Sequence, residues 1–119
     1  MKNILVIGAT GQIGSELTLK LREIYGNTHV VCGYIPSAKP RGELRESGPF
    51  EICDVTNPEQ IATVVLKHHV DTIYNLAALL SVVAEGRPQL AWKIGIDGLW
   101  NVLEVAREHE CAVFTPSSI

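Results

Sequence analysis

The sequence predicts an α/β fold, a doubly wound parallel sheet of about five strands with helices on both faces. Short apolar runs of strand length alternate with stretches of helical apolar spacing along the chain. The first run, Ile4 to Ile7, is apolar throughout, as in a strand covered on both sides. A glycine-rich segment joins that run to the first helical stretch. These three observations indicate strand–helix–strand units rather than an all-helical or all-strand domain.

Length, composition and charge narrow the classes of function. The 119 residues, 46% of them hydrophobic, have the length of one domain and can bury a core. A net charge of −3 with scattered basic residues gives no surface for nucleic acid. No apolar run reaches the roughly 20 residues that cross a bilayer, and no secretion signal opens the chain, so we expect a cytoplasmic protein without a membrane partner.

The cysteines Cys32, Cys53 and Cys111 are widely separated and stand in apolar surroundings. We therefore expect three buried free thiols and neither a disulfide nor a metal site.

The segment from Gly8 to Gly14 predicts a site for the diphosphate of a dinucleotide. A strand that ends in a glycine turn and continues into a helix presents unpaired N–H groups and a positive dipole end to an anion. Gly8 permits the tight turn, Gly11 allows the phosphates to approach the backbone, and Gly14 allows the helix to pack closely. The strand before and the helix after the glycines distinguish this segment from an ordinary turn.

The remaining elements of the first half follow from apolar spacing. We expect a strand over Lys2 to Ile7, a helix that ends near Gly26, and a second strand over Thr28 to Tyr34. Pro36 to Pro49 reads as a surface loop without predictable structure. The side of the first helix expected to face the sheet carries Ile13, Leu17, Leu21 and Ile24.

The second half begins with a short strand over Phe50 to Cys53 and a strong helix start. Asn57 is expected to cap that helix, Pro58 to occupy its first position, and Gln60 to reach back as in a capping box. Its inner side is expected to carry Ile61, Val64, Val65 and His68, with His68 and His69 as a polar helix end rather than metal ligands.

A fourth strand over Val70 to Leu76 precedes a long helix from Pro88 to about His109 and a fifth strand over Ala112 to Phe114. The long helix has two apolar sides, which imply two packing partners, the sheet and a second subunit, so we expect a homo-oligomer. The sheet side is expected to carry Leu99, Val102, Leu103 and Ala106, and the other side Trp92, Ile96 and Trp100.

The end of the second strand departs from the usual pattern of NAD-binding folds. An Asp or Glu normally stands there, about 20 residues beyond the glycines, and holds the adenosine ribose. Here Tyr34 is followed by Ile35 and Pro36, and the nearest arginine, Arg41, lies in the next loop. Tyr34 either stacks on the adenine or caps the ribose, or it packs against its neighbours.

Several segments together resemble the extended short-chain dehydrogenase/reductase superfamily, the NAD-dependent epimerases and dehydratases. The chain is most similar to the L-threonine 3-dehydrogenase branch, which is related to sugar-nucleotide 4-epimerases. The segments that carry the resemblance are Gly8–Leu17, Ser47–Glu51, Val70–Ser81, Asn101–His109 and Pro116–Ile119.

The resemblance implies the Rossmann-like N-terminal portion of an NAD-binding domain, NAD as cofactor and L-threonine as a small-molecule substrate. The implied reaction oxidises the 3-hydroxyl of L-threonine and yields 2-amino-3-ketobutyrate. The resemblance also implies roles for single residues. The pyrophosphate is held by Gly8, Gly11, Gln12 and Ile13, and the adenine is bordered by Asp54 and Val55. The path to the nicotinamide is lined by Leu76, Ala77 and Ala78, the substrate is contacted by Ser81, and the reacting alcohol is hydrogen-bonded by Ser118 or Ser117.

The catalytic Tyr-x-x-x-Lys of the family is not found in these residues, because Tyr25, Tyr34 and Tyr74 are not followed by Lys four positions on. The tyrosine is the acid and base of the reaction, and the lysine lowers its pKa. We therefore expect residues 1–119 to be a dinucleotide-binding domain, truncated before that helix and the substrate-covering region and inactive alone. A non-catalytic NAD(H)-binding module and a sugar-nucleotide epimerase relative remain alternatives.

Overall fold

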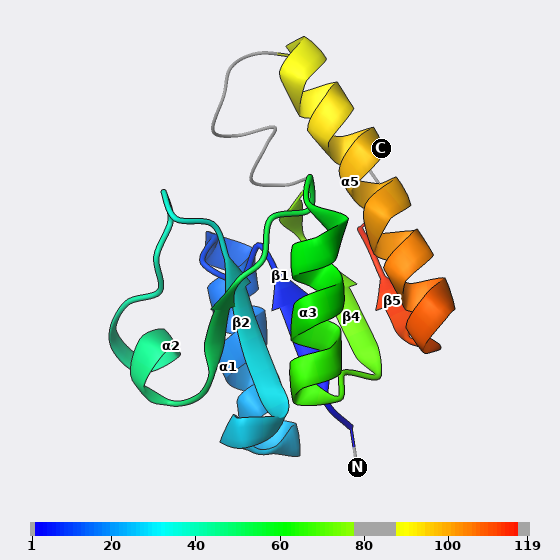
Figure 1. Ribbon diagram of the computed structural model, residues 1–119. Helices are drawn as coiled ribbons and strands as arrows, with labels where there is room; N and C mark the ends of the chain where they lie inside the picture. The colour runs from blue at the N-terminus through cyan, green and yellow to red at the C-terminus, as the bar shows by residue number, and fades with distance from the viewer. Residues whose placement is uncertain (1, 78–87, 117–119) are drawn as a thin grey trace.

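The computed structural model describes residues 2–77 and 88–116, with the backbone alone for residues 88 and 90–94. It confirms the predicted α/β fold, a parallel sheet of five strands in the order β3-β2-β1-β4-β5 (Figure 1). The strands are β1 (Ile4–Ile7), β2 (Val30–Tyr34), β3 (Phe50–Ile52), β4 (Thr72–Asn75) and β5 (Ala112–Phe114). The helices are α1 (Gln12–Tyr25), the 3-10 turn η1 (Asn27–His29), α2 (Gly42–Glu46), α3 (Pro58–His68) and α5 (Pro88–His109).

The helices cover the sheet from two sides, with α1 on one face and α3 and α5 on the other (Figure 1). The central strand β1 shows how the sequence supports both layers, because its side chains alternate between the faces. Leu5 and Ile7 join the core beneath α3 and α5, whereas Ile4 and Val6 join the core beneath α1. All four side chains of β1 are buried, as the continuous apolar run predicts.

The buried side of α1 differs from the predicted one. Gly14, Thr18 and Leu21 face the sheet, whereas Ile13 and Ile24 are 61% and 60% exposed. The prediction for Ile13 and Ile24 was wrong because the close contact at Gly14 sets the rotation of the helix. At about 100° per residue, Ile13 and Ile24 lie about 100° and 80° around the helix axis from Gly14, at the edge of the buried stripe.

A buried arginine organises the segment predicted as an unstructured loop. Arg22 of α1 is only 2% exposed, and its guanidinium donates to the carbonyl oxygens of Leu44 (2.6 Å), Pro49 (2.7 Å) and Val30 (3.1 Å). Burial lowers the pKa of Arg22, an effect that the nearby Cys32 opposes. The loop prediction was wrong because the segment contains α2 and buries Leu44, and five residues are too few for a helical pattern to be visible.

The start of α3 follows the predicted cap with one exception. The Asn57 side chain accepts bonds from the N–H groups of Glu59 (3.1 Å) and Gln60 (3.3 Å), and Pro58 occupies the first turn. The Gln60 side chain does not complete a capping box, because its Oε1 accepts from the N–H of Asp54 at 3.0 Å. The carbonyl of Asp54 in turn accepts from the N–H of Asn57, so the β3–α3 turn satisfies the groups that a capping box would pair.

Helix α5 presents one apolar side to the sheet and another to solvent. Val102, Val105 and Ala106 are buried against the core, and the prediction named Val102 and Ala106. Leu103 was wrongly assigned to the sheet side, because it is 45% exposed. It lies with Ile96 and Trp100 on an outer apolar stripe, at spacings of four and three residues.

Cys32 and Cys53 are buried free thiols, as expected, and burial raises the pKa of Cys32 to about 11 and that of Cys53 to about 12. Cys111 is only half buried, against the prediction, and its thiol donates to the carbonyl of Val70. Within the described residues, no helix has the length and apolar character that a bilayer crossing requires.

Candidate functional site

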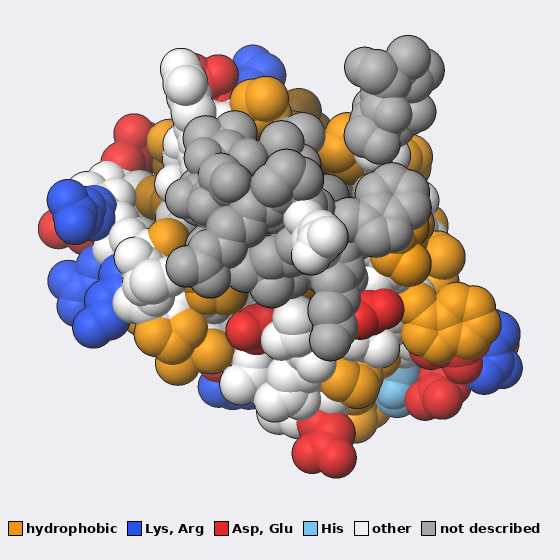
Figure 2. All heavy atoms as spheres, turned by 90° about the horizontal axis from the view of Figure 1, so that it is seen from above, with side chains coloured by type: hydrophobic (Ala, Val, Ile, Leu, Met, Phe, Trp, Pro, Cys, Tyr) orange, Lys and Arg blue, Asp and Glu red, His pale blue; other side chains and the backbone are white. Residues whose placement is uncertain are grey.

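The candidate site lies where the strands end. In a parallel sheet all carboxyl ends meet at one edge, and ligands bind where neighbouring strands lead their connections in opposite directions. Here β1 lies between β2 and β4, and Ile7 at its end pairs in register with Gly33 and Asn75. Figure 2 views the molecule from this edge. The glycine segment therefore emerges between the ends of two neighbouring strands.

Gly8 makes the turn that the sequence predicts. Its φ is +77°, a left-handed backbone conformation that favours glycine. An added Cβ at Gly8 would also lie 2.9 Å from the carbonyl carbon of Leu76 and 3.0 Å from the nitrogen of Ala77. The turn thus passes directly against the backbone that follows β4. The N–H groups of Gly8 and Ala9 both donate to the carbonyl of Gly33 at 3.1 Å, which fixes the turn to the end of β2.

The turn leads into the uncapped start of α1. Gly11 occupies the cap position and brings no side-chain cap, while the N–H of Ser15 closes the first turn on the carbonyl of Gly11 at 2.8 Å. At Gly14 an added Cβ would lie 2.3 Å from the carbonyl oxygen of Gly8. The close packing predicted for Gly14 is therefore present, and it is directed at the turn itself.

The hydroxyl of Thr10, in the middle of this turn, is buried and has no hydrogen-bond partner among the described residues. An unpaired buried hydroxyl is costly in free energy, and a ligand oxygen would satisfy it. Together with the cradle at Gly8 and the helix start at Gln12, it fits the diphosphate of a dinucleotide. The assignments of Gly8, Gly11, Gln12 and Ile13 to the pyrophosphate stay predictions that this geometry supports.

Asp54 and Val55, predicted at the adenine edge, are held by local contacts. The Asp54 carboxylate accepts from the N–H (2.9 Å) and hydroxyl (2.7 Å) of Thr56. Val55 is buried against α5, where a Cβ on Gly98 would lie 2.6 Å from its Cγ2. The side-chain amide of Asn101 donates to the carbonyl of Val55 at 2.8 Å. Sequence reasoning missed Asn101. A polar amide on the otherwise apolar inner side of α5 could have indicated this hydrogen bond.

Tyr34 is half buried at the end of β2, with its ring tilted against Phe50 at a centroid distance of 6.2 Å. This contact agrees with the interpretation that Tyr34 packs against its neighbours. Leu76 is buried and Ala77 half buried directly after β4, next to the glycine turn. The predicted residues Ala78, Ser81, Ser117 and Ser118 lie outside the described residues.

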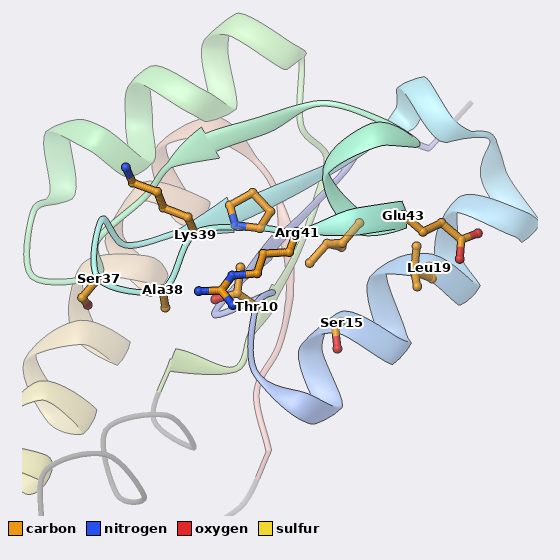
Figure 3. A pocket seen from close by; sticks show the side chains of 10 residues that line it. Thr10, Ser15, Leu19, Ser37, Ala38, Lys39, Arg41 and Glu43 are labelled. Carbon is orange, nitrogen blue, oxygen red and sulfur yellow. The ribbon is translucent and has the colours of Figure 1, made fainter.

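A cavity of about 490 Å³ opens beside the glycine turn (Figure 3). Thr10, Ser15 and Leu19 line one side, and Lys39 and Arg41 of the segment before α2 line the other. Sequence reasoning placed Arg41 in the next loop and missed Lys39, because the fold of that loop was not visible in the pattern. In the described part of the chain, no group of three His, Cys, Asp or Glu side chains could hold a metal ion.

Comparison with known proteins identifies the family of this site. Residues 4–118 match the profile of the NAD dependent epimerase/dehydratase family. The chain belongs to this family. Its fold and its glycine turn are therefore those of an epimerase/dehydratase family member, in agreement with the resemblance predicted from sequence.

The family relatives include solved L-threonine dehydrogenases. The structure of L-threonine dehydrogenase from Clostridium difficile is 48% identical, with a TM-score of 0.87 over 99% of this chain and 37% of that one. The holo form of a GalE-like L-threonine dehydrogenase from Cupriavidus necator is 43% identical, with a TM-score of 0.83 over 98% of this chain and 37% of that one. An uncharacterized epimerase/dehydratase from Staphylococcus haemolyticus is 48% identical over the whole of this chain. The chain spans 37% of the length of that relative.

Proposed function

We propose that these residues form the dinucleotide-binding part of an oxidoreductase that converts the 3-hydroxyl of L-threonine to a ketone, with NAD as the acceptor. The observation that carries the proposal is the likeness to the Clostridium difficile enzyme, 48% identical across 99% of this chain. The glycine turn supports it, since Gly8, Thr10 and Gly14 form a cradle that fits a diphosphate.

The residues of this chain would act by binding and orientation. Backbone N–H groups at the start of α1 face the negative charge of the diphosphate, and the helix dipole adds to their effect. A bound nicotinamide would supply the acceptor for the hydride that leaves the alcohol carbon of the substrate. The backbone of Leu76 and Ala77 lies against the glycine turn, so it borders the path from the diphosphate toward the reacting end.

Proton transfer requires groups beyond the described site. Ser118 would donate or accept a hydrogen bond at the reacting alcohol, and Ser81 would contact the substrate. A serine hydroxyl orients an alcohol but does not remove its proton at neutral pH. No tyrosine of this sequence is followed by Lys four residues on, so the proposed base lies outside residues 1–119.

A second candidate is a module that binds a nicotinamide dinucleotide without turnover. The same sequence observation favours it, because these 119 residues hold the cradle but no Tyr-x-x-x-Lys. Both candidates predict binding, and they differ in whether catalysis is recovered when the missing base is supplied by a longer form of the protein.

The proposal is tested by titrating the purified chain with NADH and following energy transfer from tryptophan. We expect saturable binding, and its loss in Gly8→Ala, where φ and contact with Leu76 both oppose a side chain. The matched control is Gly95→Ala, where an added Cβ meets nothing within 4 Å. Absence of binding by NADH and NADPH at millimolar concentration would contradict both candidates.

Turnover is measured separately, as growth of NADH absorbance with L-threonine and NAD. We expect none from residues 1–119 alone. A full-length protein that binds NADH but leaves L-threonine unchanged would overturn the dehydrogenase proposal and leave the binding module.

A further inference from the structure

We infer that the cavity beside the glycine turn receives the extra phosphate on the adenosine ribose of NADP(H), so that this chain binds NADP(H) more tightly than NAD(H). The inference rests on the proposed function in one respect, that a dinucleotide lies on the glycine turn. It concerns the ribose end of that dinucleotide, makes NADP rather than NAD the favoured acceptor of the proposed reaction, and holds whichever substrate is oxidised or reduced.

The position of the cavity matches that end. In this fold the adenosine ribose lies at the carboxyl end of the second strand. Here that strand end is tied to the glycine turn, because the carbonyl of Gly33 accepts from the N–H groups of Gly8 and Ala9. The cavity begins at Thr10, the next residue of the same turn, and extends to the segment that follows β2. A group attached to the ribose would therefore enter it.

The residue that would repel a phosphate there is missing. A carboxylate at the end of the second strand binds the ribose hydroxyls of NAD and opposes the negative charge of NADP. Tyr34 stands at that strand end, packed against Phe50, and presents a phenol in place of a carboxylate. At position 34 the chain therefore has no carboxylate that would select against a phosphate.

Two cations, Lys39 and Arg41, line the cavity. Lys39 and Arg41 are exposed, and neither forms an ion pair or hydrogen bond within the described residues. In Figure 3 the guanidinium of Arg41 reaches toward Thr10, while the ammonium of Lys39 points away from Arg41. We therefore assign the direct phosphate contact to Arg41, whose planar donors suit phosphate oxygens. Lys39, at the edge of the cavity, attracts the phosphate by its positive charge without contacting it.

One carboxylate, that of Glu43, also lines the cavity. Figure 3 shows it at the opposite end from the Arg41 guanidinium, beyond Leu19. The basic end is thus the one beside the glycine turn.

The segment that carries the cations is held in place before any ligand binds. Pro40 and Leu44 are buried on either side of Arg41. Arg22 bonds the carbonyls of Leu44 and Pro49 from beneath. A segment fixed by these contacts presents Arg41 with little loss of backbone entropy on binding, which favours affinity.

The experiment compares equilibrium binding of NADPH and NADH to the purified chain by calorimetry. We expect NADPH to bind at least about tenfold more tightly, the ratio that one charge-assisted contact provides. Adenosine 2′,5′-bisphosphate should likewise bind more tightly than adenosine 5′-phosphate. The preference should shrink as salt is raised, since Arg41 is exposed.

Three variants locate the contact. Arg41→Ala should remove most of the NADPH preference and leave NADH binding unchanged, and Lys39→Ala should reduce it less. Arg45→Ala is the matched control, an exposed arginine that lies over Phe50 rather than in the cavity. Tyr34→Asp should reverse the preference by restoring a ribose-binding acid.

The outcomes separate this inference from the proposed function. Binding of NADH as tight as that of NADPH would overturn the inference and leave the proposed function standing. An NADPH preference that survives Arg41→Ala, with native circular dichroism, would overturn the assignment of the cavity. Failure of both dinucleotides to bind would overturn both proposals.

Discussion

At the scale of single residues, the site depends on two places where a side chain cannot fit. Gly8 adopts a left-handed conformation against the backbone of Leu76, and Gly14 brings α1 against the carbonyl of Gly8. These two contacts make the turn, the helix start and the end of β4 one rigid unit. A change at either glycine should therefore affect ligand binding and stability together.

Gly14→Ala should destabilise the chain and abolish dinucleotide binding. Its Cβ would lie 2.3 Å from the Gly8 oxygen, so the helix start must move. Overpacking of this kind costs about 1–3 kcal/mol, measured as the free energy of unfolding in urea. The control is Gly95→Ala in α5, which should instead stabilise by about 1 kcal/mol, the helix propensity difference. Equal effects of the two substitutions would show that the close contact at Gly14 is unimportant.

Sequence reasoning succeeded where local pattern decides structure and failed where distant contacts do. The buried run Ile4–Ile7 and the glycine turn are local features, and both were predicted. Arg22 reads as a solvent-facing helix residue, because its three carbonyl partners lie on other elements. The same contacts fold the segment before β3. The sequence pattern therefore could not predict the cavity or the position of Arg41 in its lining.

At the scale of elements, strand β3 and helix α3 are joined by one carboxylate. Glu51 of β3 lies 2.6 Å from Nε2 of His68 and 2.8 Å from Nζ of Lys67, both at the end of α3. Burial raises the pKa of Glu51, but hydrogen bonds and charge from Lys67 and His68 outweigh burial and lower it. His68 was predicted to be part of a polar end of its helix. The structure adds a contact between this end of α3 and Glu51 of strand β3.

This lowered pKa predicts a pH-dependent stability. A carboxyl whose pKa is lower in the folded state stabilises the fold above its unfolded value of about 4.3, and the effect is lost as pH falls through the folded pKa. Glu51→Gln should therefore reduce the free energy of unfolding more at pH 7 than at pH 3, measured in urea at both. Glu16→Gln, an exposed side chain without a partner among the described residues, is the control and should have little effect at pH 7. A loss of the same size at both pH values for Glu51→Gln would show that the contact is not ionic.

At the scale of the whole molecule, apolar surface remains on two sides of the described structure. Ile96, Trp100 and Leu103 form the outer stripe of α5, and Phe114 of the edge strand β5 is 54% exposed. Exposed hydrophobic side chains lie on the α5 side in Figure 2. Apolar stripes of this kind mark interfaces in soluble proteins, and an unpaired edge strand also favours association. The chain spans 37% of the length of the similar Clostridium difficile enzyme.

We expect residues 1–119, purified by themselves, to self-associate through the exposed stripe on α5. Trp100→Glu should shift sedimentation velocity profiles toward the monomer, because burying the new carboxylate in an apolar interface is unfavourable. Leu66→Glu is the matched control, since Leu66 is 61% exposed on α3 and lies outside the stripe. A wild-type chain that stays monomeric across the concentration range would contradict the prediction. If both variants dissociate the oligomer equally, net charge rather than the stripe on α5 controls association.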